Sequence, residues 1–392
     1  MATKKGVWDL QDVRDKQLQS LWSYAGERQL FAWGRNEDSS ARATLGLNDE
    51  AARSSPTQVT GATWSGLRGS IERQGPVALK TDGTLWTWGI NDFGQQGDNE
   101  NLPATNMISS PKQVPGTTWD GGAVGIFFKM GTKTDGTLWS WGSNVTYGML
   151  GHSNLTEYSS PNQVGSNTNW SGDRTKLSAA NHVLAIKTDG TLWGWGRNNA
   201  GQLGTQNTTN YSSPRQVPGT NWSSVSCGYW NSLATKTDGT LWSWGANAAT
   251  SLGHSQPTDT YYSSPKQIPG TNWKITEGGI NCRRNSMSAL KTDGTLWSWG
   301  SNNYGELGLN NRTQKSSPEQ VPGTTWDKFT QGGRHESMAL KTDGTLWSWG
   351  ENNYGEVGDI TRVRRSSPTQ IPGTSWIELA SIYEAKFAIK NV

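Results

Sequence analysis

A phrase of seven residues, Leu-Trp-x-Trp-Gly-x-Asn, recurs along this chain with steps of 49 to 55 residues between its glycines. The full copies occupy residues 85–91, 138–144, 192–198, 241–247, 296–302 and 346–352, and a degenerate copy lies at residues 30–36. A period near fifty residues indicates a repeat architecture, in which each copy is one supersecondary unit. This period overrides the usual relation between chain length and number of domains, so residues 27–392 are expected to form one domain.

The two ends of the repeat region predict how the repeats are arranged. Each repeat has two apolar halves, Ala-Leu-Lys-Thr-Asp-Gly and Thr-Leu-Trp-Ser-Trp-Gly, and the Asp-Gly between them is typical of a tight hairpin. The first copy lacks the Ala-Leu-Lys half, whereas residues 387–392 are that half without its partner. An open solenoid would need polar capping repeats, but a repeat split between the two termini closes a ring and removes exposed sheet edges. We therefore predict an all-β, seven-bladed β-propeller in which residues 27–36 pair with residues 387–392.

The chain contains 23 tryptophans, and the repeated phrase accounts for more than half of them. Fully burying one such ring contributes roughly 4–6 kcal/mol of gross hydrophobic stabilisation. We expect the paired tryptophans to pack inside the blades, where they would not be available to a partner. The alternative is that they form a set of platforms on which carbohydrate rings stack.

Bulk properties and the scattered polar residues predict no catalysis, no cofactor and no metal. The net charge of +3 is too small for a nucleic-acid footprint, and no apolar run reaches the length of a membrane span. The start of the chain lacks a signal-peptide core, so we expect synthesis in the cytoplasm without ordinary export. The histidines lie in different repeats without a second ligand at metal spacing, and the two cysteines form no framework. We interpret the aspartates of the Asp-Gly turns, such as Asp189 and Asp343, as turn formers.

Residues 1–26 precede the repeats and are predicted to form a short helical attachment arm. Asp9 can cap the helix, and a rough apolar stripe follows it. The stripe consists of Trp8, Leu10, Val13, Leu21 and Trp22. A helix this short is marginal alone, so the arm either folds back on the propeller or docks on another subunit.

Each repeat also has a lone tryptophan ahead of its Ala-Leu-Lys strand, and the stretch between the two varies most among the repeats. The lone tryptophans are Trp64, Trp119, Trp170, Trp222, Trp273, Trp326 and Trp376. Equivalent loops of a propeller collect on one face around the channel mouth, which predicts a ring of aromatic, basic and amide side chains suited to protein or glycan contact. The candidate binding residues are Arg73, Phe127, Phe128, His182, Tyr229, Trp230, Arg283, Arg284, Arg334, His335 and Tyr383. The alternatives are that these loops are merely unconstrained, or that the binding surface is formed by the loops from Trp-Gly-x-Asn to a second repeated phrase. That phrase, Ser-Ser-Pro-x-Gln-Val/Ile, starts at residues 54, 109, 159, 212, 263, 316 and 366.

The extended phrase Thr-Leu-Trp-x-Trp-Gly-x-Asn-x-x-Gly-Glu/Gln-Leu-Gly resembles the repeat of the regulator of chromosome condensation family. Its best copies continue at residues 198–204 and 302–308, and residues 332–335 resemble the family's Gly-x-x-His lead-in. The resemblance implies a seven-bladed propeller. Family members exchange nucleotide on a small GTPase, bind histones, inhibit β-lactamases or bind other proteins. This chain has no basic run at its start comparable with the exchange factor's targeting tail, so the exchange activity is not expected.

Two functional hypotheses follow from these observations. The near-identical copies look like the bacterial and phage-encoded versions of the family, and residues 6–11 are similar to the Gly-Val-Trp-x-Leu-Gln start of marine-phage virion proteins. The first hypothesis is therefore a multicopy, non-enzymatic virion component (a tail fibre, receptor-binding or decoration protein). Its arm would bind other virion proteins, and its propeller would face a host surface protein or glycan. The second is a soluble intracellular regulator or inhibitor that binds one protein.

Overall fold

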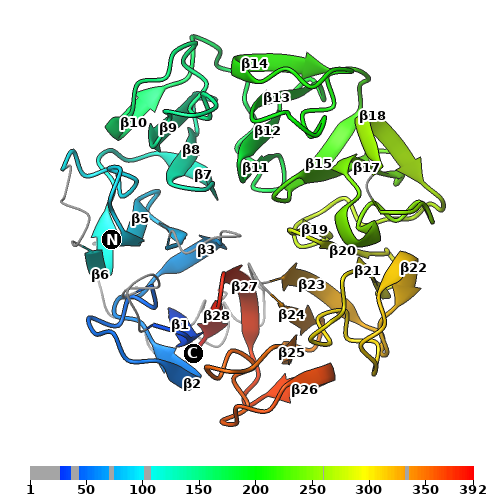
Figure 1. The fold of residues 1–392 in the computed structure, drawn as a ribbon. Coiled ribbons are helices and arrows are strands. Elements are labelled where there is room, and N and C mark those ends of the chain that lie inside the picture. Colours follow the sequence, from blue (N-terminus) through cyan, green and yellow to red (C-terminus); the bar gives the residue numbers. More distant parts are fainter. Residues whose placement is uncertain (1–26, 37–43, 70–74, 101–106, 259, 332–334) are drawn as a thin grey trace, which may run out of the picture.

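Seven four-stranded antiparallel sheets surround a central channel in the computed structural model of the protein (Figure 1). The structure describes residues 27–36, 44–69, 75–100, 107–258, 260–331 and 335–392. The predicted attachment arm lies outside the described residues, so its helix and its apolar stripe remain predictions. The seven-bladed propeller itself is confirmed.

The strands fall into four sets according to their position in a blade. The inner strands, around the channel, are β3 (Trp64–Arg68), β7 (Trp119–Val124), β11 (Leu177–Ala179), β15 (Trp222–Cys227), β19 (Ile280–Cys282), β23 (Trp326–Gln331) and β27 (Trp376–Ile382). The second strands are β4 (Val77–Lys80), β8 (Phe128–Lys133), β12 (His182–Ile186), β16 (Asn231–Lys236), β20 (Ser286–Leu290), β24 (Glu336–Lys341) and β28 (Ala385–Asn391). The third strands are β5 (Leu85–Ile90), β9 (Leu138–Gly142), β13 (Leu192–Gly196), β17 (Leu241–Ala246), β21 (Leu296–Gly300), β25 (Leu346–Gly350) and β1 (Arg28–Gly34). The outer strands are β6 (Met107–Gln113), β10 (Tyr158–Gln163), β14 (Tyr211–Val217), β18 (Tyr261–Ile268), β22 (Lys315–Gln320), β26 (Arg365–Ile371) and β2 (Arg53–Gln58), and a short 3-10 helix, η1 (Ala248–Thr250), follows β17.

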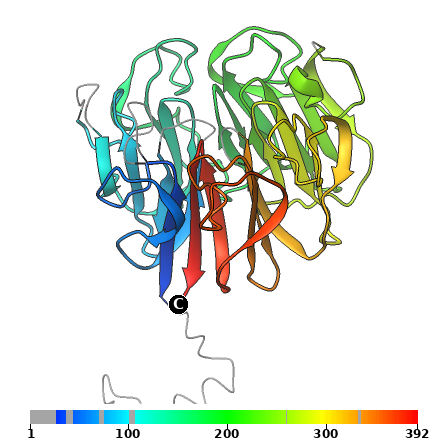
Figure 2. The same ribbon diagram turned by 60° about the horizontal axis from the view of Figure 1, so that its bottom comes forward.

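The last blade is assembled from both ends of the chain, in the strand order β2-β1-β28-β27. Strands β1 and β28 pair without interruption from Arg28 opposite Asn391 to Gly34 opposite Ala385. The C-terminus lies at the lower rim in Figure 2, on the side of the Asp-Gly turns. The predicted closure of the ring by the termini is therefore confirmed.

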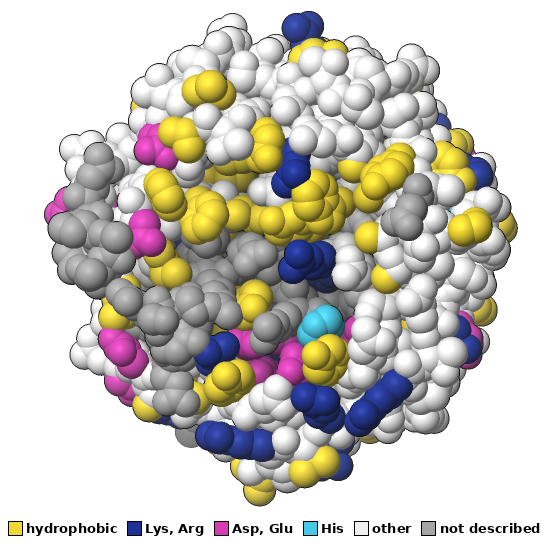
Figure 3. All heavy atoms as spheres, viewed as in Figure 1, with side chains coloured by type: hydrophobic (Ala, Val, Ile, Leu, Met, Phe, Trp, Pro, Cys, Tyr) yellow, Lys and Arg dark blue, Asp and Glu magenta, His cyan; other side chains and the backbone are white. Residues whose placement is uncertain are grey.

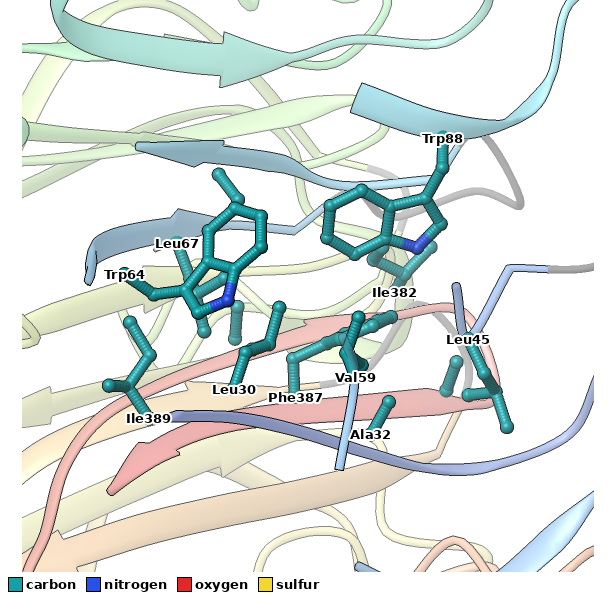
Figure 4. Close-up of a cluster of buried hydrophobic side chains, with 13 residues drawn as sticks. Leu30, Ala32, Leu45, Val59, Trp64, Leu67, Trp88, Ile382, Phe387 and Ile389 are labelled. Carbon is teal, nitrogen blue, oxygen red and sulfur yellow. The ribbon is translucent and has the colours of Figure 1, made fainter. Parts of the chain in front are cut away.

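Side chains of these two strands also pack into the next blade (Figure 4). Leu30, Phe387 and Ile389 lie in one buried cluster with Trp64 and Trp88 of the following sheet. The indole of Trp88 meets the ring of Phe387 edge-on at a centroid distance of 5.9 Å. Apolar burial is the dominant favourable contribution to folding, so this cluster stabilises the seam between the two blades.

The Asp-Gly turns form as the sequence predicts. In the third blade along the chain, Asp189 Oδ1 accepts hydrogen bonds from the backbone N–H and the hydroxyl of Thr191, at 2.9 and 2.6 Å. The Thr191 hydroxyl oxygen in turn accepts one from Trp193 Nε1 at 3.0 Å. The hydrogen bonds from Thr191 lower the pKa of Asp189, as expected for a carboxylate that accepts two donors. These aspartates are turn formers.

The glycine after each second tryptophan adopts a backbone conformation that other residues rarely adopt. Gly34 has φ of +100°, and the ladder between β1 and β2 shifts register there. A Cβ atom at this position would lie 2.3 Å from the carbonyl oxygen of Glu384, so a side chain would clash as well as strain the backbone. The Trp-Gly pair of the repeat thus marks a β-bulge where the third strand bends toward the loop.

Two rings of hydrogen bonds join neighbouring blades. The second tryptophan of each phrase is fully buried, and its Nε1 donates to a backbone carbonyl in the loop of the preceding blade. The seven pairs are Trp33 to Glu356, Trp88 to Thr44, Trp141 to Gln95, Trp195 to Met149, Trp244 to Gln202, Trp299 to Ser251 and Trp349 to Glu306, at 2.8–3.1 Å. In the second ring, a backbone N–H of each such loop donates to a serine carbonyl of the following outer strand, as Gln206 does to Ser263 at 2.8 Å.

The first tryptophan of each pair departs from our expectation, because it is only half-buried in all six full phrases. Trp86 illustrates the arrangement: Lys80 Nζ lies 4.1 Å from its ring centroid, and the lone Trp64 meets it edge-on at 6.1 Å. This cation–π contact recurs in the other five full repeats. The prediction that both tryptophans pack inside the blade is correct for the second one only.

Candidate functional site: the variable-loop face

The loops that join inner to second strands lie at the face opposite the Asp-Gly turns, which we call the variable-loop face. Figure 3 looks onto this face and shows a band of hydrophobic side chains across it, with basic and acidic groups beside the band. The predicted candidates that reach the surface here are Phe127, Tyr229, Trp230, Arg284, His335 and Tyr383, which are half-buried or exposed. Arg73 and Arg334 lie outside the described residues.

Three of the predicted binding residues are buried and do not face solvent. Phe128 and His182 begin second strands, and their side chains point between blades instead of toward the channel mouth. The His182 ring lies 2.8 Å (Nε2) from the hydroxyl of Ser232, and burial lowers its pKa to about 3. His182 is therefore neutral at physiological pH and part of the packing. Arg283 is also buried, and it reaches across the channel to the carbonyl of Ser381 at 3.4 Å.

Aromatic rings and arginines from four consecutive blades meet in one place on this face. The Arg197 guanidinium lies 3.7 Å from the ring centroid of Trp230 and 4.9 Å from that of Tyr147. Tyr229 packs on Trp230 at 5.0 Å, and Arg284 covers the other end of the row at 4.9 Å from Tyr229. We call these five residues the aromatic–arginine cluster. Among the described residues, no carboxylate forms an ion pair with Arg197 or Arg284, so both guanidiniums are free to bind an acidic group.

A second aromatic group flanks the cluster. The imidazole of His335 stacks on Tyr304 with a centroid distance of 4.1 Å and an interplanar angle of 18°. Its Nδ1 lies 3.3 Å from Glu306 Oε1, and the Arg364 guanidinium covers Tyr304 at 4.8 Å. Phe127, which is 39% exposed, meets Phe93 edge-on at 5.2 Å.

Sequence reasoning missed several residues of this face because they lie inside the repeated phrase. Tyr147, Phe93 and Tyr304 precede the glycine that follows Trp-Gly-x-Asn, and Arg197 is the variable residue within that phrase. A signal was present, since the residue before that glycine is aromatic at positions 93, 147, 304 and 354 but alanine at position 200. Variation inside an otherwise constant phrase is therefore informative here.

Charged side chains also cross the channel below this face. Glu277 contacts Arg68, Arg174 and Lys328 at 3.3–3.4 Å. Glu378 contacts Arg174 at 3.4 Å and Lys328 at 3.1 Å. Burial alone would raise the pKa of Glu277, but the three cations lower it to about 2. These ion pairs connect loops and inner strands of different blades, so they fix the channel rather than offer a catalytic acid.

Within the described ranges, no three side chains of histidine, cysteine, aspartate or glutamate converge to hold a metal ion. His152 and His254 each contact a serine hydroxyl of a third strand at 2.9 Å. No helix in the described part of the chain is long and apolar enough to cross a membrane.

Comparisons with known proteins agree with this architecture. Models of the regulator of chromosome condensation (RCC1) repeat match residues 189–235, 293–338 and 343–381, and a second model of the same repeat matches residues 222–249 and 327–356. The ultraviolet-B receptor UVR8 of Arabidopsis thaliana is 28% identical over 78% of this chain and 69% of its own length. The protein RCC2 homolog of Danio rerio is 26% identical over 74% of this chain, which spans 62% of that relative. The human E3 ubiquitin-protein ligase HERC2 is 26% identical over 80% of this chain, but the match spans only 6% of that protein.

Solved structures support the fold alone, because their sequence identity is low. Yeast RCC1 (Prp20), in a crystal structure with Kap60, has a TM-score of 0.79 at 19% identity and covers 95% of this chain and 92% of its own. Human WBSCR16 has a TM-score of 0.78 at 18% identity and covers 93% of this chain and 99% of its own. The chain is thus a seven-bladed β-propeller that carries repeats of the regulator of chromosome condensation (RCC1) type.

Proposed function

We propose that this protein is a non-enzymatic binding propeller that holds a protein partner on its variable-loop face, as a regulator or inhibitor would. The observation that carries the proposal is the aromatic–arginine cluster, in which two arginines that form no ion pair with a described carboxylate lie on half-buried rings. Aromatic and arginine side chains dominate the binding energy of many protein interfaces, because rings bury large areas and guanidiniums pair with carboxylates. The partner surface is expected to combine apolar and acidic side chains.

Two crystal structures of a similar protein support this type of function. One is the yeast RCC1 protein Prp20 bound to Kap60, and another concerns the binding of Prp20p to Gsp1p and histones. These partners belong to those proteins, and we do not assign them to this chain. They support the general use of an RCC1-type propeller as a protein-binding scaffold.

A matched pair of variants tests the proposal. The double substitution Arg197→Ala and Trp230→Ala removes one cation–π pair from the cluster, whereas Arg215→Ala and Tyr211→Ala removes a similar pair, at 5.1 Å, from outer strand β14. A protein captured by the wild type should lose about 2 kcal/mol or more of binding free energy with the cluster variant, measured by titration calorimetry. The β14 variant should bind normally. Equal affinity of the cluster variant and the wild type would contradict the proposed site.

The finer hypothesis of a virion component rests on the arm and on the similarity of residues 6–11 to virion proteins. The relatives named above are not virion proteins, and Trp8 and Trp22 lie outside the described residues. We therefore place the regulator or inhibitor first, and keep the virion role, with its location in a particle, as a proposal that the arm can test.

A further inference from the structure

The channel contains a cavity of about 150 Å³ with an unusual cation at one end. Arg283 follows β19 and extends across the channel toward β27, where one guanidinium nitrogen donates to the carbonyl of Ser381 at the long distance of 3.4 Å. The Arg283 Nε has no hydrogen-bond partner in the described part of the chain, although the residue is only 6% exposed. A buried guanidinium normally pairs with a carboxylate or fills its five donors, so this one is poorly satisfied.

No described carboxylate neutralises Arg283 directly. Glu336 is the carboxylate whose charge acts on it most strongly, but Glu336 forms its ion pair with Lys386, at 3.8 Å. Burial lowers the pKa of the Arg283 guanidinium to about 10, which still leaves it charged at neutral pH. The cavity thus holds a positive charge whose desolvation is not balanced by the described residues.

The remaining lining of the cavity suits an anion. Among the described residues that line it, the charged ones are four cations (Arg68, Arg174, Arg283 and Lys328) and two carboxylates (Glu277 and Glu378). Hydroxyl groups and apolar side chains also line it: Ser178 Oγ accepts the backbone N–H of Cys227 at 2.9 Å, and Ser226 Oγ accepts that of Cys282 at 2.8 Å. Because each hydroxyl oxygen accepts from the backbone, its hydrogen remains available to donate.

We propose that this cavity binds one small oxyanion of the size of inorganic phosphate, with Arg283 as the principal contact and the serine hydroxyls as further donors. A volume of about 150 Å³ leaves room for an ion of this size. Arg68, Arg174 and Lys328 are ion-paired with Glu277 and Glu378, so they are not expected to contact the anion directly. Their positive charges still make the electrostatic potential in the cavity more favourable for an anion. The site lies inside the channel and is separate from the aromatic–arginine cluster on the surface.

The test uses the full-length protein, dialysed into chloride buffer and titrated with inorganic phosphate at constant ionic strength. Calorimetry should show saturable binding of about one phosphate per chain, and the melting temperature should rise with phosphate concentration until the site is filled. Arg283→Gln should weaken the affinity at least about tenfold, since a charge-assisted hydrogen bond contributes that much or more. Arg284→Gln, which removes the exposed neighbouring charge, should bind phosphate like the wild type.

Two outcomes would overturn the proposal. Absence of saturable phosphate binding to the wild-type protein does so without reference to any variant. The second is a large loss of stability of Arg283→Gln in chloride alone, which would show that Arg283 has a structural partner within the chain. We expect the opposite, because removing an unpaired buried charge relieves its desolvation, so Arg283→Gln in chloride should melt at or above the wild-type temperature.

Discussion

Trp33 Nε1 donates a hydrogen bond of 3.1 Å to the backbone carbonyl of Glu356, although Trp33 and Glu356 are 323 positions apart in the chain. An equivalent contact joins each of the remaining pairs of neighbouring blades. Here it connects the blade made from both termini to the last continuous blade. The ring is therefore closed by a repeated tertiary contact as well as by the pairing of β1 with β28.

Removing residues 387–392 should destabilise the whole ring. The deletion takes away most of β28, including Phe387, Ala388 and Ile389, which are fully buried, and leaves β1 and β27 with unpaired edges. We expect a lower melting temperature and aggregation on heating, measured by circular dichroism and light scattering. Deleting only Val392, which is 61% exposed, is the control and should change little. A full truncation that melts like the wild type would disprove the role of the seam.

The two tryptophans of one phrase should respond differently to replacement by phenylalanine. Trp244→Phe removes one of the two donors to the buried carbonyl of Gln202, the other being the Ser232 hydroxyl, and the lost hydrogen bond costs about 0.5–1.5 kcal/mol in the free energy of unfolding, apart from the packing lost with the smaller ring. Trp242→Phe should cost less, because Trp242 is half-buried and the first copy of the phrase already carries Phe31 at that position. Urea unfolding of the two variants measures both effects. A larger loss of unfolding free energy for Trp242→Phe than for Trp244→Phe would contradict the prediction that the buried second tryptophan contributes more to stability.

Glu356 should make stability depend on pH in the direction opposite to an ordinary ion-paired carboxylate. Burial, with repulsion from Glu336, raises the pKa of Glu356 to about 8, from an ordinary value of 4.5. The folded state therefore holds a proton that the unfolded chain releases above pH 4.5, and stability falls as the pH rises from about 4.5 to 8. Gln95 and Gln202 occupy the equivalent position in other blades, so Glu356→Gln should fit without strain.

Melting temperatures of Glu356→Gln and the wild type, measured between pH 4 and pH 9, check this prediction. The variant should be more stable than the wild type near pH 8, and the difference should vanish near pH 4, where the carboxyl is protonated in both states. A difference that does not change with pH would mean that the charge of Glu356 does not matter.

The arm can be tested apart from the propeller. Replacing Trp8 and Trp22 by alanine removes the two largest apolar side chains of the arm, which belong to no repeat. We expect the far-ultraviolet spectrum and the melting of the propeller to stay almost unchanged, and incorporation into an assembly to be lost. Particle purification followed by immunodetection measures the latter. Normal incorporation of the double variant, or absence of the wild type from particles, would favour the soluble regulator.

The features that the sequence predicted best depend either on the local chemistry of a few residues or on the number of half-repeats in the chain. The Asp-Gly hairpins follow from two residues, and the closure follows from the unpaired half-repeat that includes Phe387. The fate of Arg283 and Arg284 could not be predicted in this way. These neighbours lie in the bend between β19 and β20, and the path of that bend places Arg283 inside the channel and Arg284 on the surface.

The channel network was equally hidden from sequence. Arg174 and Glu277 lie in stretches after Trp170 and Trp273, where the inner strand begins later than in other blades. Their partners Lys328 and Glu378 are far away in the chain, so only the ring geometry brings them within 3.4 Å. The aromatic–arginine cluster was hard to predict for two reasons. Its residues come from four blades, and Tyr147 and Arg197 lie in or next to the repeated phrase, where they looked like parts of the scaffold.

The acceptor in each indole contact between blades belongs to the main chain, and that has an evolutionary consequence. No substitution can remove a backbone carbonyl, so the side chain at this position is released from holding the ring together. The seven positions already carry five residue types in one chain: Thr44, Gln95, Met149, Gln202, Ser251, Glu306 and Glu356. Because this position lies next to the variable-loop face, selection can alter what the face presents, one blade at a time, while the joints between blades stay the same.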